Sequence, residues 1–201
     1  MDGFGDQFGT VRTVAVDLYT AAYRISGSLP TRFVRVADIV NQVSTTHLAV
    51  ERATVSEYAD PTATLSAGQV LVSLSEILVV VVNETTGETA HAEMRIPKRP
   101  VRAQVALPPF RLTGFIHVPH GSRPIDGLLN AVDRFLPMTD TTLASSAYPE
   151  LGRHVAALAL QRDLAHLILV SDDERPDELL AEVLDERTAE SWLRPEQESA
   201  R

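Results

Sequence analysis

The amino-acid sequence repeats itself, and this internal repeat constrains the fold more than any other feature. The stretch YRISGSLPTRFVRVADIVN (residues 23–41) is matched by FRLTGFIHVPHGSRPIDGLLN (residues 110–130), and the offset between matched positions stays at 87 to 89 residues. Within the two stretches, Gly27 corresponds to Gly114. A nearly constant offset over several motifs is typical of a duplicated structural unit. We therefore expect two copies of one small fold.

Alternation of apolar and polar residues predicts that each copy is built from β-strands. It is clear in VAVDLYT (residues 14–20), LAVERATV (48–55) and VLVSL (70–74), and a period of two is the signature of a half-buried strand. The segments RVADIVN and RPIDGLLN instead carry apolar residues at helical spacing, and Pro124 suits a first helical position. A single unit of about 70 residues buries little surface. We predict a mainly β protein with short helices, in which two tandem SH3-like or Sm-like small β-barrel repeats form a pseudo-dimer.

The changes in composition along the chain predict its domain boundaries. The connector RIPKRPVR combines two prolines with four basic residues, and prolines disfavour regular structure there. The C-terminal segment is rich in acids and has an apolar stripe at helical spacing. The predicted parts are a disordered lead-in (residues 1–13), the first β-repeat (14–94), the basic connector (95–102), the second β-repeat (103–170) and an amphipathic acidic C-terminal helix and tail (171–201).

The repeated motifs also resemble a known family. An aromatic residue followed by R-I/L-S/T-G, then R-x-x-D and a nearby Asn, and then an apolar strand, occurs in both halves of residues 14–170. This pattern resembles an uncharacterised family of bacterial domains of unknown function. The resemblance implies duplication and a bacterial origin, and it assigns no functional residue.

Charge and composition exclude several function classes. The chain has no cysteine, which rules out disulfides, thiolate metal sites and cysteine nucleophiles. The formal net charge is −9, which argues against general affinity for nucleic acid because phosphate binding needs a basic face. No signal peptide or membrane-spanning apolar segment is indicated. We expect a cytoplasmic protein that does not bind a membrane.

Two repeated polar sets invite a catalytic interpretation. An arginine can hold an anion while an aspartate accepts a proton. However, residues three apart at a helix start commonly form an ion pair, and a set kept in both copies of a duplicated scaffold favours a structural role. We interpret as structural the residues Arg35, Asp38 and Asn41 of the first copy and Arg123, Asp126 and Asn130 of the second.

Other candidates for catalysis or metal binding lack a recognised pattern. His117 and His120 in HVPH, together with His91 and His154, do not have ligand spacing. The adjacent serines Ser145 and Ser146 lie outside any G-x-S-x-G turn. We therefore predict no cofactor, no metal and no enzymatic activity.

The remaining features favour a non-catalytic, intracellular protein-interaction or regulatory module. The acidic C-terminal helix would bind another protein, and its possible contact residues are Leu180, Val183, Leu184 and Trp192. The alternative function is binding of nucleic acid or a nucleotide ligand through the repeat loops and the basic connector, whose anion-contacting residues would be Arg95, Lys98, Arg99 and Arg102.

Overall fold

A computed structural model describes residues 11–83 and 98–171 of the chain. The described part is mainly β, with two short α-helices and three 3₁₀ turns. In the first repeat the elements are β1 (Arg12–Tyr19), β2 (Tyr23–Thr31), α1 (Val36–Asn41), β3 (His47–Glu57), β4 (Thr64–Ser73), η1 (Leu74–Glu76) and β5 (Val79–Val82). In the second they are β6 (Lys98–Leu107), β7 (Phe110–Pro119), α2 (Pro124–Leu129), β8 (Phe135–Ala144), η2 (Pro149–Leu151), β9 (Arg153–Gln161), η3 (Arg162–Leu164) and β10 (Leu167–Val170).

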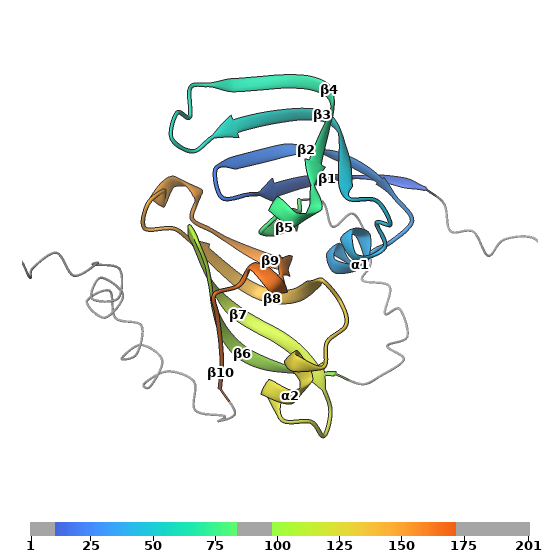
Figure 1. Cartoon of the computed structure of the whole chain (residues 1–201), viewed down its shortest axis with the longest axis vertical. Helices are drawn as coiled ribbons and strands as arrows, with labels where there is room; N and C mark the ends of the chain where they lie inside the picture. The colour runs from blue at the N-terminus through green and yellow to red at the C-terminus, as the bar shows by residue number, and fades with distance from the viewer. Residues whose placement is uncertain (1–10, 84–97, 172–201) are drawn as a thin grey trace, which may run out of the picture. The chain divides into compact units, whose positions relative to one another are not determined.

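The strands of both repeats belong to one ten-stranded antiparallel sheet (Figure 1). Its order is β10-β6-β7-β8-β9-β5-β1-β2-β3-β4. Within this order the second repeat reads β10-β6-β7-β8-β9 and the first reads β5-β1-β2-β3-β4, so strands at equivalent places in the sequence occupy equivalent places in the sheet. The predicted duplication of topology is confirmed.

The prediction of two small SH3-like or Sm-like β-barrels is wrong, because the ten strands form one open sheet. Closing the first repeat on itself would require β5 to pair with β4. Instead, β5 pairs with β1 on one side and with β9 of the second repeat on the other, with Val79 opposite Leu160 and Val81 opposite Leu158. The edge of β5 that would close a barrel is therefore used to join the two repeats. The two repeats form a single sheet instead of two separate barrels.

A β-bulge recurs at the same place in both repeats. The pairing of β2 with β3 shifts next to Gly27, and that of β7 with β8 shifts next to Gly114. A Cβ at Gly27 would lie 2.7 Å from the carbonyl oxygen of Glu51, and one at Gly114 would lie 2.9 Å from that of Thr139. A side chain has no room in either place, which explains both glycines.

The two predicted helices are present, and strand β6 includes residues of the predicted connector. α1 and α2 cover VADIVN and PIDGLL, and Pro124 stands at the start of α2. β6 begins at Lys98, inside the predicted connector, because the alternation that marks a strand already starts there. Pro100 is accommodated because β10 pairs with β6 from Ala103 to Ala106, and no other strand in the described part of the chain pairs with β6 on that side.

The buried side chains form two hydrophobic clusters, and each cluster takes residues from both repeats. The first core lies mainly in the first repeat and includes Phe135 and Ala159 of the second. The second core lies mainly in the second repeat and includes Tyr19, Val79 and Val81 of the first. The two repeats therefore share their cores across the β5–β9 seam, as expected for units too small to bury enough surface alone.

Within the described ranges, 11–83 and 98–171, no helix has the length and apolar character needed to cross a membrane.

Candidate functional site

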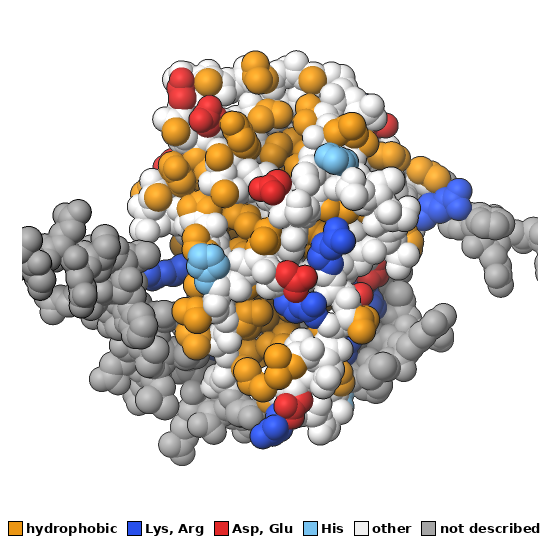
Figure 2. Space-filling model, viewed as in Figure 1, with side chains coloured by type: hydrophobic (Ala, Val, Ile, Leu, Met, Phe, Trp, Pro, Cys, Tyr) orange, Lys and Arg blue, Asp and Glu red, His pale blue; other side chains and the backbone are white. Residues whose placement is uncertain are grey.

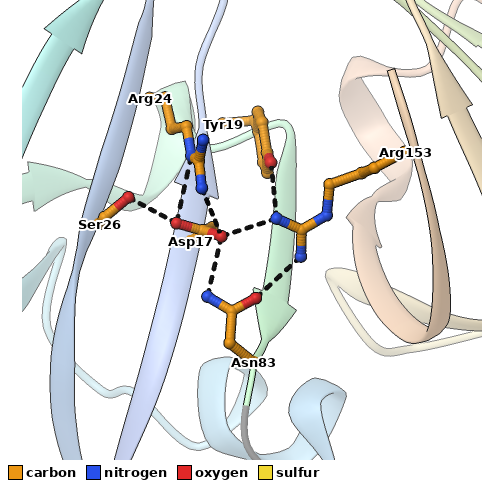
Figure 3. A network of polar contacts seen from close by, with 6 residues as sticks. All are labelled: Asp17, Tyr19, Arg24, Ser26, Asn83 and Arg153. Atoms are coloured by element: carbon orange, nitrogen blue, oxygen red, sulfur yellow. Dashed lines mark hydrogen bonds and ion pairs between the residues drawn. The ribbon is translucent and has the colours of Figure 1, made fainter. Parts of the chain in front are cut away.

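The most elaborate polar site lies at the junction of the two repeats and is centred on Asp17 of β1 (Figure 3). The Asp17 side chain is 1% exposed. Arg24 of β2 donates from Nε to Oδ1 at 3.2 Å and from Nη2 to Oδ2 at 3.0 Å. Ser26 Oγ donates to Oδ1 at 2.5 Å, and Asn83 Nδ2 donates to Oδ2 at 2.8 Å. The carboxylate is thus surrounded by donors.

One of these donors comes from the other repeat. Arg153, the first residue of β9, donates from Nη1 to Asp17 Oδ2 at 2.8 Å and to the Tyr19 hydroxyl at 3.2 Å. Its Nη2 donates to Asn83 Oδ1 at 2.8 Å. Figure 3 shows Arg153 approaching the carboxylate from the side opposite Ser26. We call Asp17, Tyr19, Arg24, Ser26, Asn83 and Arg153 the junction network.

The environment of Asp17 determines its chemistry. Burial opposes ionisation, but the hydrogen bonds from Arg24, Ser26, Asn83 and Arg153 outweigh it and lower the pKa to about 2. Such a carboxylate stays charged at neutral pH and accepts a proton poorly, so it is unsuited to general base catalysis. The pKa of Tyr19 is raised, chiefly because burial disfavours the phenolate. The network is suited to holding strands of the two repeats together.

Sequence reasoning missed the junction network. The available signal was Asp17 itself, the one charged residue in the otherwise uncharged run TVAVDLYT. A charge on a buried strand requires a partner. Its partner Arg153 lies 136 residues away in the sequence, and no local pattern connects them.

A second contact between the repeats involves Asn41, at the end of α1. Its Nδ2 donates to the Phe135 carbonyl oxygen at 2.9 Å, and the Phe135 N–H donates to its Oδ1 at 2.9 Å. The side chain thereby satisfies both backbone groups of the first residue of β8. Asn130 of the second repeat instead donates to the Asp126 carbonyl oxygen within its own helix, at 2.8 Å. The two asparagines that the sequence pairs therefore make different contacts.

The outer edges of the sheet are the other candidate site. Among the described residues, β4 and β10 each pair with a strand on one side only. β4 contains ten residues, TLSAGQVLVS, and the first six are exposed. Leu65 and Leu71 on this strand are 73% and 66% exposed. In Figure 2, viewed as in Figure 1, hydrophobic side chains reach the surface at the end of the molecule that carries β3 and β4.

The predicted structural ion pair is present in the second copy. Arg123 Nε donates to Asp126 Oδ2 at 2.8 Å, and its Nη2 donates to Oδ1 at 3.2 Å. The guanidinium lowers the pKa of Asp126. Both side chains lie at the surface, so the pair orders the start of α2 without forming an enclosed site.

The histidines and serines that we considered do not converge. His117 Nε2 lies 2.9 Å from Thr139 Oγ1, and burial lowers the pKa of His117. His154 Nε2 lies 3.1 Å from Asp140 Oδ1 at the surface. Ser145 Oγ accepts a hydrogen bond from the Tyr148 N–H. No group of three or more His, Asp or Glu side chains that could hold a metal occurs in the part of the chain that the structure describes, and His91 lies outside it.

The basic residues of the predicted anion site do not share one face of their strand. Lys98 and Arg102 have the same parity in β6, whereas Arg99 has the opposite parity, and successive strand residues point to opposite faces. Arg99 Nη2 donates to the Ser122 carbonyl oxygen at 3.5 Å. The remaining predicted contacts lie outside the described residues, and they are Arg95, Leu180, Val183, Leu184 and Trp192.

Comparison with known proteins adds no identification: no family model matches the chain, and neither a curated protein nor a solved structure matches it. The resemblance to an uncharacterised bacterial family stays a prediction.

Proposed function

We propose that this protein is a non-catalytic protein-interaction module that binds extended segments of other chains along the outer edge of its sheet. The proposal rests on the unprotected character of the edge strand β4. It is a ten-residue edge strand that contains no charged residue and no proline. Edge strands expose unpaired backbone N–H and C=O groups, and proteins normally protect such edges with charges, prolines or bulges.

The side chains of β4 support strand addition. Leu65 and Leu71 have the same parity, so both belong to one face of the strand, and both are more than half exposed. In strand addition the backbone supplies affinity and alternate side chains supply specificity. A partner segment with apolar residues at every second position would cover both leucines.

The chemistry of the most buried polar site agrees with a binding role. The donors around Asp17 come from β2, from β9 and from Asn83, which directly follows β5, and they link these parts to β1. A carboxylate with a pKa of about 2 does not assist proton transfer at neutral pH. The scattered basic residues of β6 do not support the alternative of nucleic-acid binding, which needs a basic face.

Selection of displayed random ten-residue peptides against the full chain tests the proposal. We expect the selected peptides to alternate apolar and polar residues. They should bind the Leu71→Lys variant at least about tenfold more weakly than the wild type, since a charge in an edge strand opposes pairing. Val34→Lys is the matched control, because Val34 is 49% exposed and lies in the segment between β2 and α1, outside both edge strands. Failure to select any peptide, or equal binding to both variants, would contradict the proposal.

A further inference from the structure

The two repeats are joined head to tail, and this arrangement leaves complementary edges at the two ends of the sheet. β5 of the first repeat pairs with β9 of the second. The counterpart of β5 in the second repeat is β10, and the counterpart of β9 in the first repeat is β4. These two counterparts are the outermost strands of the sheet. In a head-to-tail contact of this kind, each added copy presents the same free edge again, so further copies can bind.

We propose that copies of this chain associate head to tail, with β10 of one copy pairing antiparallel with β4 of the next in the manner of the internal β5–β9 seam. Transferring the internal register places Leu167 opposite Val72 and Leu169 opposite Val70 of the next copy. The inference rests on the proposed function and deepens it, since it names a second copy of this chain as the partner at the β4 edge.

The side chains of β10 are arranged for this contact. In the internal seam, Val79 and Val81 of β5 are buried in the core of the neighbouring repeat. Their counterparts are Leu167 and Leu169, which belong to neither core, and Leu167 is 56% exposed. The alternate residues Ile168 and Val170 pack against the core of their own repeat. One side of β10 therefore carries large apolar side chains that its own repeat does not cover.

The β4 edge also carries an exposed apolar side chain at a position that is buried in the internal seam. In the internal seam, β8 and β9 place Phe135 and Ala159 in the core of the neighbouring repeat, and both are 0% exposed. The counterpart of Ala159 is Leu71, which is 66% exposed, and the counterpart of Phe135 is His47, which is exposed. Pairing with a second copy would bury Leu71 in the same way as Ala159.

The two helices also differ in how far a neighbouring repeat covers them. α1 packs against β8 and β9 of the neighbouring repeat, whereas the main contact of α2 is with β7 of its own repeat. Ala37 of α1 is 5% exposed, while its counterpart Ile125 of α2 is 50% exposed. Leu129, the last residue of α2 as Asn41 is the last residue of α1, is 77% exposed. A second copy at the β10 edge would place its β3 and β4 next to α2.

Exposed apolar side chains are concentrated at these two edges. Six of the ten large hydrophobic residues that are exposed in the described part of the chain lie on β4, on α2 and the turn after it, or on β10. They are Leu65, Leu71, Ile125, Leu129, Val132 and Leu167. Such a distribution marks an interaction surface more clearly than isolated exposed residues do.

The seam between copies would differ from the internal seam in charge. The counterpart of Asp17 is Gln104, and the counterpart of Arg153 is Leu65. The buried ion pair of the internal seam is therefore replaced by an amide and a leucine. We expect association to persist in 1 M NaCl, because apolar contacts are not weakened by salt screening.

Sedimentation velocity of the full chain, over about 1 to 200 µM, tests the proposal. We expect the wild type to form species larger than one copy as concentration rises. Leu71→Lys and Leu167→Lys should each prevent growth, because each blocks one of the two edges, while Val34→Lys should behave as the wild type. An equimolar mixture of Leu71→Lys and Leu167→Lys should form a species of two copies, since one free β10 edge and one free β4 edge remain.

Several outcomes would overturn the proposal. A wild type that stays a single copy over this concentration range would exclude the head-to-tail contact. Association of Leu167→Lys alone would indicate β4–β4 pairing, and a mixture that does not combine would exclude the head-to-tail contact. If either variant fails to melt cooperatively, Leu65→Lys and Leu129→Lys replace Leu71→Lys and Leu167→Lys. Peptide capture at the β4 edge by a chain that does not self-associate would leave the proposed function standing while excluding this inference.

Discussion

The β5–β9 seam and the β4 and β10 edges are built from equivalent strands, yet their side chains differ. At the seam, Asp17 and Arg153 form a buried ion pair, and Asn41 satisfies the backbone of β8. At the edges, the corresponding places hold Gln104, Leu65 and Leu129. The comparison teaches that the seam between the repeats is held by polar groups with specific partners, whereas the equivalent places at the edges carry an amide and exposed apolar side chains.

The largest expected effect is the loss of the buried carboxylate at the seam. Asp17→Ala removes a buried carboxylate that binds Arg24 and Arg153. Because these arginines are 40% and 26% exposed and can be solvated by water, we expect a loss of about 3 kcal/mol, the lower end of the range for breaking a buried ion pair. Gln104→Ala changes the counterpart residue and should cost less than about 1 kcal/mol. Urea unfolding of both variants measures the difference. Equal losses would mean that the seam and the edge are energetically alike.

The contact made by Asn41 gives the next comparison. Asn41→Ala removes two hydrogen bonds to the backbone of Phe135, which is 0% exposed, and should lower the free energy of unfolding by about 1 to 3 kcal/mol. Leu129→Ala, at the same place in α2, removes a side chain that is 77% exposed and should change stability by less than about 0.5 kcal/mol. Thermal melts of the two variants test this, and a larger loss for Leu129→Ala would contradict the assignment.

Acid should weaken the seam selectively. The pKa of Asp17 falls from its ordinary value of 3.8 to about 2 in the folded protein. Its contribution, about 2 kcal/mol, is therefore fully present above pH 3.8 and is lost as the pH falls toward 2. The stability advantage of the wild type over Asp17→Asn should shrink by that amount between pH 5 and pH 2 in urea titrations. A constant difference would show that the carboxylate gains nothing from the network.

The smallest expected effect on the fold comes from removing the acidic C-terminal segment. Residues 1–170 form one compact unit, so a chain that ends at Ser171 should keep a cooperative melt and change least in Tm among these variants. Sedimentation velocity also compares the association of the shortened chain with that of the full chain. Stronger association of the shortened chain would mean that residues 172–201 compete for an edge. Aggregation without a cooperative melt would mean that the segment belongs to the fold.

Features that depend on local residue patterns were predictable from the sequence. The offset between FRLTG and YRISG predicted duplicated strands, and the spacing of RPIDGLLN predicted a short helix with Pro124 at its start. A glycine inside a strand pattern is typical of a bulge, and the register of the sheet shifts beside both Gly27 and Gly114. These predictions succeed because periodicity and steric room are properties of neighbouring residues.

The pairing of the strands was decided only by the tertiary structure. The same β5 sequence, VVVV, could have closed the first repeat into the predicted barrel, since its apolar residues suit either partner. It pairs with β9 instead, where Asp17 finds Arg153 and Val79 enters the second core. Backbone hydrogen bonds do not distinguish one strand from another, so the choice depends on side chains that are far apart in the sequence. The sequence by itself determined the repeated unit, and only the folded chain determined that the unit is completed by its neighbour.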